Sequence, residues 1–280
     1  MRQVSDQTIQ VHIDLRGIGT PLFVVIQRSF DLVSLGIRAS QELPERDLEL
    51  PESFLQLIAS SRARLTFDDA RKEFRAWVIA SGLRDCIEGI GLLFEEVRRV
   101  CALYSFGPRS RLTRATWQRA MVSDSKKFRN LNLPDKIHWL HKMYSLDLLT
   151  DNTSRLLTLN RARNCLVHRY GVVSDRDCNE AMHLAVEWEG IEFLVEGDDG
   201  LRSIALPGGV VKKGETLCMR PTKRRREFSI GERIDLTIEE FASLLWFFFK
   251  YGKLIPTVIE DYGRRCGFTI SHNQTVNDKS

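Results

Sequence analysis

Apolar residues recur at intervals of three and four over residues 67–104, which is the spacing of a helix with one buried face. Thr66 precedes this run as an N-cap, and two acidic residues follow in the first turn, where the helix dipole favours negative charge. Gly82 indicates a break into two helices, and Gly107-Pro108 ends the run. The pattern predicts long helices packed in a bundle.

The same spacing, together with start and stop residues, predicts further helices along the chain. They are expected at residues 21–36, 111–129, 134–145, 151–170, 177–186, 237–251 and 255–265. Residues 9–15 alternate apolar and polar positions, which predicts a strand, and residues 54–58 suggest a short helix within a loop.

The character of the sequence changes after residue 187, where short β-rich runs are separated by Gly-rich turns. These runs are residues 188–195, 204–206, 215–219 and 227–230. We therefore expect a mainly α fold, a helical bundle with a small antiparallel β insert and an N-terminal extension. The expected organisation is an extension at 1–66, a helical core at 67–187, a β-rich insert at 188–236, C-terminal helices at 237–270 and a polar tail at 271–280.

Composition points to an ordinary globular protein. The chain has 280 residues, of which 43% are hydrophobic and 28% charged, and its net charge is +4. The six cysteines form no C-x-x-C pair, which favours reduced thiols in a cytoplasmic protein. The N-terminus lacks the apolar region of a signal peptide, and the longest apolar runs, 22–26 and 244–249, are too short to span a bilayer. We expect no membrane partner.

The run from Arg163 to Tyr170 carries the most chemistry. His168 can accept and donate a proton near neutral pH, and Arg163 can grip phosphate oxygens with its planar guanidinium. At about 100° per residue, however, these two side chains lie about 140° apart on one helix. Arg161, Asn164 and His168 share one stripe instead, so Arg161 remains a second candidate for the functional arginine.

This arrangement, R-x4-H-x-Y with Asn164 directly after the arginine, resembles the signature of the HEPN superfamily, and the resemblance covers roughly residues 67–187. It implies a HEPN-like helical core and a metal-independent endoribonuclease that needs no cofactor, as in a toxin or an anti-phage (abortive infection) effector. It also implies a homodimer through the motif helix, in which both copies of the motif line one cleft. His168 would transfer protons, Arg163 would stabilise the charged phosphate, and Asn164 would orient the site.

The resemblance also implies a modification site at Tyr170 and a protein partner. In HEPN toxins paired with a minimal nucleotidyltransferase antitoxin, the tyrosine at this motif position is the site of AMP attachment, so Tyr170 is a candidate modification site and an antitoxin or nucleotidyltransferase a candidate partner. The plainer interpretation is a tyrosine that packs at the end of the helix. The expected RNA is a tRNA or an mRNA. The alternatives are a non-catalytic HEPN-like module that binds RNA or protein, and a helical scaffold whose motif is accidental.

Two clusters of basic residues are candidates for contact with RNA. The expected RNA-binding residues are Arg109, Arg111, Arg114, Arg119, Lys126 and Lys127 in the first cluster, and Lys223, Arg224, Arg225 and Arg226 in the second. The alternative for both clusters is a solvated surface or a surface that meets an acidic protein.

Other candidate sites are weaker. His138 and His141 are three apart, but no third ligand accompanies them in the sequence, so no metal site is predicted. Gly17-Ile18-Gly19 lacks the third glycine of a dinucleotide loop. The aromatic run 246–249 is expected in a core or a dimer interface.

Overall fold

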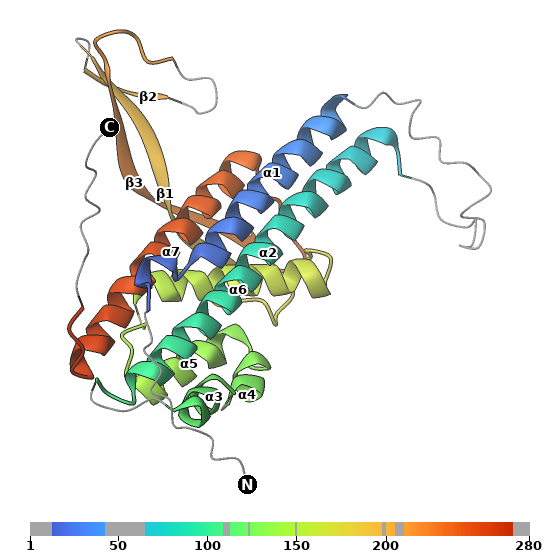
Figure 1. Cartoon of the computed structure of the whole chain (residues 1–280). Helices are drawn as coiled ribbons and strands as arrows, with labels where there is room; N and C mark the ends of the chain where they lie inside the picture. Colours follow the sequence, from blue (N-terminus) through green and yellow to red (C-terminus); the bar gives the residue numbers. More distant parts are fainter. Residues whose placement is uncertain are drawn as a thin grey trace. The chain divides into compact units, whose positions relative to one another are not determined.

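The computed structural model describes residues 13–42, 65–108, 113–122, 124–148, 150–197, 200–204 and 210–270. This part of the chain is mainly helical, with one small antiparallel sheet (Figure 1), as expected. The helices are α1 (Thr20–Glu42), α2 (Phe67–Tyr104), α3 (Arg114–Val122), α4 (Ser125–Arg129), α5 (Leu133–Tyr144), α6 (Asp151–His168) and α7 (Ile238–Arg265). The strands are β1 (His183–Gly197), β2 (Gly200–Ile204) and β3 (Thr216–Ser229).

The described residues group into two compact units, each built from segments that are distant in sequence. One unit contains the described parts of Met1–Phe23, Gly89–Leu157 and Phe249–Ser280. The other contains the described parts of Val24–Glu88 and Thr158–Phe248. Four helices, α1, α2, α6 and α7, contribute residues to both units. The Arg163–Tyr170 motif and the sheet belong to the second unit, which we call the motif unit.

The N-terminal predictions are borne out only in part. Helix α1 begins close to the predicted start but continues past Gly36 to Glu42. The predicted strand at residues 9–15 lies mostly outside the described residues, and Leu15 itself is in a 3₁₀ turn. The predicted short helix at residues 54–58 lies outside them as well. By length and composition α1 is apolar enough to cross a membrane, a property that core helices and signal sequences share.

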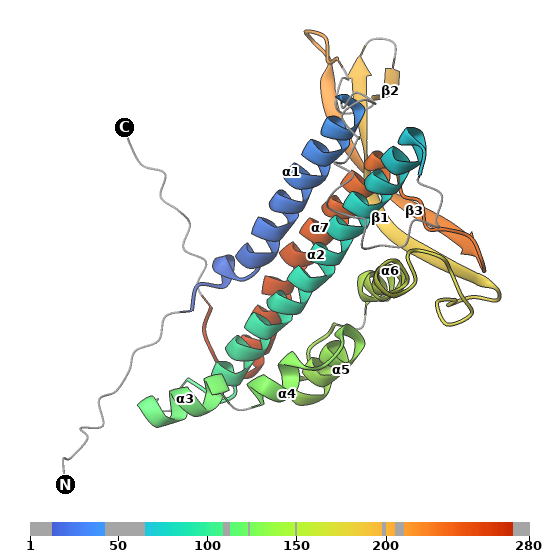
Figure 2. The same cartoon turned by 90° about the vertical axis from the view of Figure 1, so that its right-hand side faces the viewer.

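Helix α2 is unbroken, so the predicted break at Gly82 is wrong. A Cβ atom at position 82 would lie 2.5 Å from the Phe241 ring and 2.8 Å from Val33. The glycine therefore permits the close approach of α1 and α7 to α2 rather than ending the helix. In the motif unit, α1 and the first half of α2 lie side by side (Figures 1 and 2), and Val78 fits against Gly36.

The helix predicted at 111–129 is two helices, α3 and α4. They are separated at Asp124, whose φ of 57° is left-handed and cannot continue a helix. Helix α5 confirms the prediction for residues 134–145. Asn132 caps it by accepting a hydrogen bond from the Asp135 amide at 2.9 Å, and Ser145 ends it with a left-handed backbone.

The short helix predicted at 177–186 is wrong, because the chain turns there and enters strand β1 at His183. Asn179 forms two hydrogen bonds with the backbone of Ala185, at 2.8 and 2.9 Å, which close a loop instead of a helical turn. Met182 has a φ of 64°, which is also incompatible with a helix. Local apolar spacing was outweighed here by side-chain hydrogen bonds to the backbone.

The sheet has the strand order β2-β1-β3, and both pairings are antiparallel. The predicted strands at 215–219 and 227–230 are the two ends of one long strand, β3, which runs along β1 as a ribbon (Figure 2). Pro221 is tolerated in its middle because β3 is an edge strand. Strand β2 overlaps the predicted 204–206 run only at Ile204, and the rest of that run lies outside the described residues.

Strand β1 packs on helix α7 within the motif unit. The indole of Trp188, which is buried, donates a hydrogen bond to the Ser243 hydroxyl at 2.9 Å. A Cβ atom at Gly190 would lie 2.3 Å from the same hydroxyl oxygen, so only glycine fits beneath Ser243. This contact fixes the sheet against the helices of the unit.

Helix α7 is one continuous helix, so the predicted division before residue 255 is wrong. Pro256 lies inside it, at a cost of about 3 kcal/mol. Ile255 and Ile259, on either side of the proline, are fully buried, and each such burial stabilises by about 1.5–3 kcal/mol. Packing therefore outweighs the local penalty. Within the aromatic run 246–249, which was expected in a core or a dimer interface, Phe247 and Phe248 are buried in the core and Trp246 and Phe249 are partly exposed.

Candidate functional site

Helix α6 carries the R-x4-H motif to its last turn and ends at His168. Both the Arg169 and the Gly171 amides donate to the Cys165 carbonyl, at 2.9 and 3.2 Å, so one carbonyl of the last turn accepts from two residues beyond the helix end. Tyr170 follows the helix with a left-handed backbone, at φ 54°, a conformation in which glycine is usual, and Gly171 is left-handed as well, at φ 79°. The chain accepts strain at a tyrosine whose side chain is 87% exposed.

Arg163 is held by two neighbours in the motif unit. Its Nη2 lies 3.2 Å from Oε1 of Glu88 on α2, and its Nη1 donates to Oδ1 of Asn164 at 3.1 Å. The Arg163 side chain is mostly covered, at 23% exposure, whereas that of Glu88 is 58% exposed. Arg163 and the adjacent Asn164 are thus joined by a hydrogen bond, and a carboxylate also contacts the guanidinium.

Arg161, the second candidate for the functional arginine, contacts a backbone carbonyl and not Glu88. Its Nη1 donates to the Cys178 carbonyl at 3.1 Å, in the loop between α6 and β1. The side chain is exposed and has a neutral acceptor rather than an acid. Arg161 therefore has no acidic partner among the described residues.

His168 makes the fewest polar side-chain contacts of the three candidate catalytic residues. It is exposed, and its side chain makes no hydrogen bond or ion pair with any residue that the structure describes. No hydrogen bond joins it to Arg163, which faces Glu88 of α2. As the 140° separation on the helix predicts, one chain does not assemble Arg163 and His168 into a single compact site. Apolar side chains beside His168 are also exposed, namely Val167 (42%) and Val172 (44%).

Cys165, inside the motif, has a packing role. It is fully buried, and burial raises the pKa of its thiol to about 11. A thiol protonated at neutral pH is a poor nucleophile. All six cysteines in the chain are free, with Cys86 and Cys101 buried as well.

Arg169 forms an ion pair that the sequence motif does not predict. Its Nε donates to Oδ2 of Asp177 at 2.8 Å and its Nη2 contacts Oδ1, so the pair is bidentate. Asp177 is buried and also accepts hydrogen bonds from the Ser174 amide and hydroxyl, at 2.9 and 2.8 Å. The signal was available, since a serine three residues before an aspartate is a common turn motif.

The charge state of Asp177 follows from this setting. Burial raises the pKa of a carboxyl group, but the hydrogen bonds from Arg169 and Ser174 outweigh burial here and lower the pKa of Asp177 below its usual value. The same hydrogen bond raises the pKa of Arg169. Asp177 therefore stays ionised and ties the loop after the motif to the last turn of the motif helix.

The first basic cluster is only partly described. Arg109, Arg111 and the side chain of Arg119 lie outside the described residues. Arg114, Lys126 and Lys127 are exposed. Other basic residues nearby are partly neutralised, because Glu95 contacts Arg99, Arg129 and Lys136 at 3.6 to 3.9 Å.

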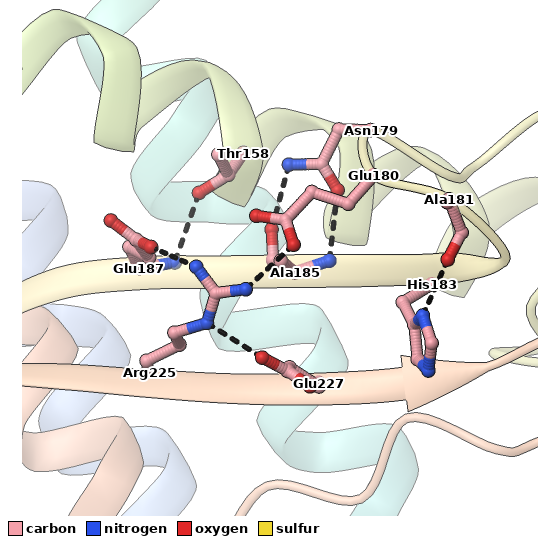
Figure 3. A network of polar contacts seen from close by, with 9 residues as sticks. All are labelled: Thr158, Asn179, Glu180, Ala181, His183, Ala185, Glu187, Arg225 and Glu227. Carbon is pink, nitrogen blue, oxygen red and sulfur yellow. Dashed lines mark hydrogen bonds and ion pairs between the residues drawn. The ribbon is translucent and has the colours of Figure 1, made fainter.

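The second basic cluster is largely paired with acids. Arg225 contacts Glu180, Glu187 and Glu227 at the end of the β ribbon (Figure 3), and these hydrogen bonds raise its pKa. Arg226 contacts Glu240 of α7. Lys223 and Arg224 are exposed, and Arg224 faces Trp188 rather than an acid across the strands. Two of the four predicted RNA-binding residues here are thus tied into ion pairs.

No group of three His, Cys, Asp or Glu side chains suited to a metal ion occurs in the part of the chain that the structure describes. His141, one of the two histidines on α5, contacts the Leu146 carbonyl at 2.9 Å through its ring nitrogen.

Comparison with models of protein families, with curated proteins and with solved structures found no match to this chain.

Proposed function

We propose that this chain is a metal-independent endoribonuclease of the HEPN type that acts as a homodimer, in the role of a toxin or an anti-phage (abortive infection) effector. The observation that carries the proposal is the end of helix α6. There an exposed histidine with no partner among the described residues, His168, follows the coupled pair Arg163 and Asn164.

The chemistry of RNA cleavage fits these side chains. A proton must leave the 2′-OH, another must reach the departing 5′ oxygen, and negative charge on the phosphate must be stabilised in between. His168 is the proton-transfer residue, because an exposed imidazole without a partner can exchange protons with substrate. Arg163 supplies the positive charge, and Asn164 orients the guanidinium through its Oδ1. The product is a 2′,3′-cyclic phosphate or its hydrolysis product.

A second copy of the chain supplies the arginine or histidine that a single chain cannot place in the same site. Arg163 and His168 lie on different sides of α6, so an arginine from one copy and a histidine from the other complete a site more readily than one helix can. Val167 and Val172 are exposed beside His168 and supply apolar surface for that contact. Burial of these residues in a dimer removes them from water.

RNA contact outside the motif is proposed for the exposed members of the basic clusters. These are Arg114, Lys126 and Lys127 in the first cluster, and Lys223 and Arg224 in the second. The exposure of Tyr170 also leaves its hydroxyl open to modification with AMP by a nucleotidyltransferase partner.

The second candidate function is a non-catalytic module that binds RNA or protein. One observation favours it, namely that Glu88 neutralises the motif arginine. Incubation of the purified protein with total RNA in EDTA separates the two. The nuclease leaves 2′,3′-cyclic phosphate ends without added metal, whereas the module shifts RNA in a gel and leaves it intact. An intact mass increased by one AMP would identify a blocked enzyme.

A further inference from the structure

Glu88 is the acidic residue that contacts the motif arginine, although 75 residues of sequence separate the two. It lies on α2, within the motif unit, and its carboxylate meets Nη2 of Arg163 at 3.2 Å. The R-x4-H motif does not include it. From this contact we infer that Glu88 is an autoinhibitory residue that occupies the phosphate-binding edge of Arg163 until RNA displaces it. The inference rests on the proposed function and adds a means of regulation to the same site.

Competition follows from the chemistry of the guanidinium. Carboxylate and phosphate oxygens bind the same N–H donors, through similar charge-assisted hydrogen bonds. While Glu88 holds Nη2, a phosphate at that edge would meet a negative charge at hydrogen-bond distance. The resting chain therefore holds its motif arginine neutralised, and RNA binding requires Glu88 to move away.

The geometry allows Glu88 to leave without disturbing Arg163. The Glu88 side chain is 58% exposed and makes one hydrogen bond to the guanidinium, so water can solvate the released carboxylate. Ion pairs at this exposure are weak. Arg163 is 23% exposed, and its Nη1 keeps the hydrogen bond to Asn164. Asn164 thus acts as a positioning residue that holds the arginine ready for phosphate.

The ion pair between Arg169 and Asp177 is an example of a permanent structural contact. Asp177 is 1% exposed, binds Arg169 in a bidentate manner and accepts two further hydrogen bonds from Ser174. A carboxylate held by so many bonds away from water cannot be exchanged for substrate. Glu88 is exposed and makes one hydrogen bond to Arg163, so phosphate can displace its carboxylate.

The test measures binding of a fluorescent single-stranded RNA oligonucleotide across a series of salt concentrations, in a His168→Ala background that prevents cleavage. Glu88→Gln preserves the shape of the side chain and removes its charge. It should tighten binding about three- to fivefold. The slope of log affinity against log salt should steepen by about 0.7, which is the effect of one more phosphate contact on a single strand.

A matched control is Glu73→Gln, which removes another exposed ion pair, with Arg233, from the same helix. It should leave affinity and slope unchanged. Arg163→Ala should abolish the effect of Glu88→Gln, because the two substitutions act on one contact. Equal or weaker binding by Glu88→Gln, or an equal gain from Glu73→Gln, would overturn the inference.

Cleavage is scored separately on chains that retain His168. If these chains cleave RNA and Glu88→Gln has no effect on affinity, the inference fails and the nuclease stands. If Glu88→Gln tightens binding but no chain cleaves RNA, Glu88 gates a binding site and the nuclease proposal fails. If no chain binds RNA at all, both proposals fail.

Discussion

Arg169 and Asp177 join the last turn of helix α6 to the loop that follows it, through a bidentate ion pair eight residues apart in sequence. The carboxylate is buried, and the Ser174 amide and hydroxyl complete its hydrogen bonds. Because this pair fixes the backbone on both sides of Tyr170 and Gly171, it sets the position of the helix end that carries His168.

Replacement of Asp177 by Asn should destabilise the protein by about 2–3 kcal/mol, since it removes one partner of a largely buried ion pair. The pKa of Asp177 is lowered in the folded chain. Its stabilisation is therefore complete above the unfolded value, about 3.9, and is lost as pH falls through the folded pKa. Urea titrations at pH 7 and pH 3 should show a smaller difference between wild type and variant at pH 3. A difference that grows in acid would contradict this assignment.

Two glycines of helix α2 should respond in opposite directions to alanine. Gly82→Ala places a methyl group 2.5 Å from Phe241 and should destabilise by about 1–3 kcal/mol through overpacking. Gly91→Ala meets only the end of Lys136, at 3.5 Å, and should stabilise by up to about 1 kcal/mol through helix propensity. Thermal unfolding measures both. Equal effects would mean that Gly82 does not mediate close packing.

The adjacent arginines of β3 should differ in their contribution to RNA binding. Arg225 is tied to three glutamates, whereas Arg224 is exposed and faces Trp188. In the His168→Ala background, Arg224→Gln should weaken binding and flatten the salt slope by about 0.7 for a single strand. Arg225→Gln should change neither. The reverse result would mean that the glutamates release Arg225 to RNA.

The proposed dimer can be tested at Val167, which is 42% exposed beside His168. Val167→Asp places a charge in the proposed interface, so sedimentation should show monomers and cleavage should fall with it. Val122→Asp is the control, because Val122 is an exposed valine on α3 (72%), outside the motif unit. If Val167→Asp remains dimeric and active, the second copy docks elsewhere.

Much of the helical content was predictable, because apolar spacing and cap residues act locally. Helix α5, with Pro134 in its first turn and Asn132 as its cap, is an example. The errors arose where distant contacts decide the outcome. Gly82 interrupts a helical pattern in the sequence, yet Phe241, 159 positions later, is what requires it. At Pro256, tertiary packing outweighs the local signal for a helix break. At Met182, a loop closed by Asn179 outweighs the local helical spacing.

The candidate site was predictable at the level of residue types and not of contacts. The sequence places Arg163, Asn164 and His168 on one helix, and helix geometry already separates the arginine from the histidine. Glu88 could not be assigned as the partner of Arg163 from spacing alone. An ion pair between two helices depends on which elements pack together, which a single sequence does not reveal.

The most direct test of the account compares the wild type with His168→Ala on total RNA in EDTA, with His138→Ala as a control for an exposed histidine on another helix. The account predicts that wild type and His138→Ala cleave the RNA, and that His168→Ala loses about 10²- to 10⁴-fold in rate while its thermal unfolding is unchanged. Equal cleavage by His168→Ala would contradict the proposed mechanism, and cleavage by none of the three would contradict the proposed activity.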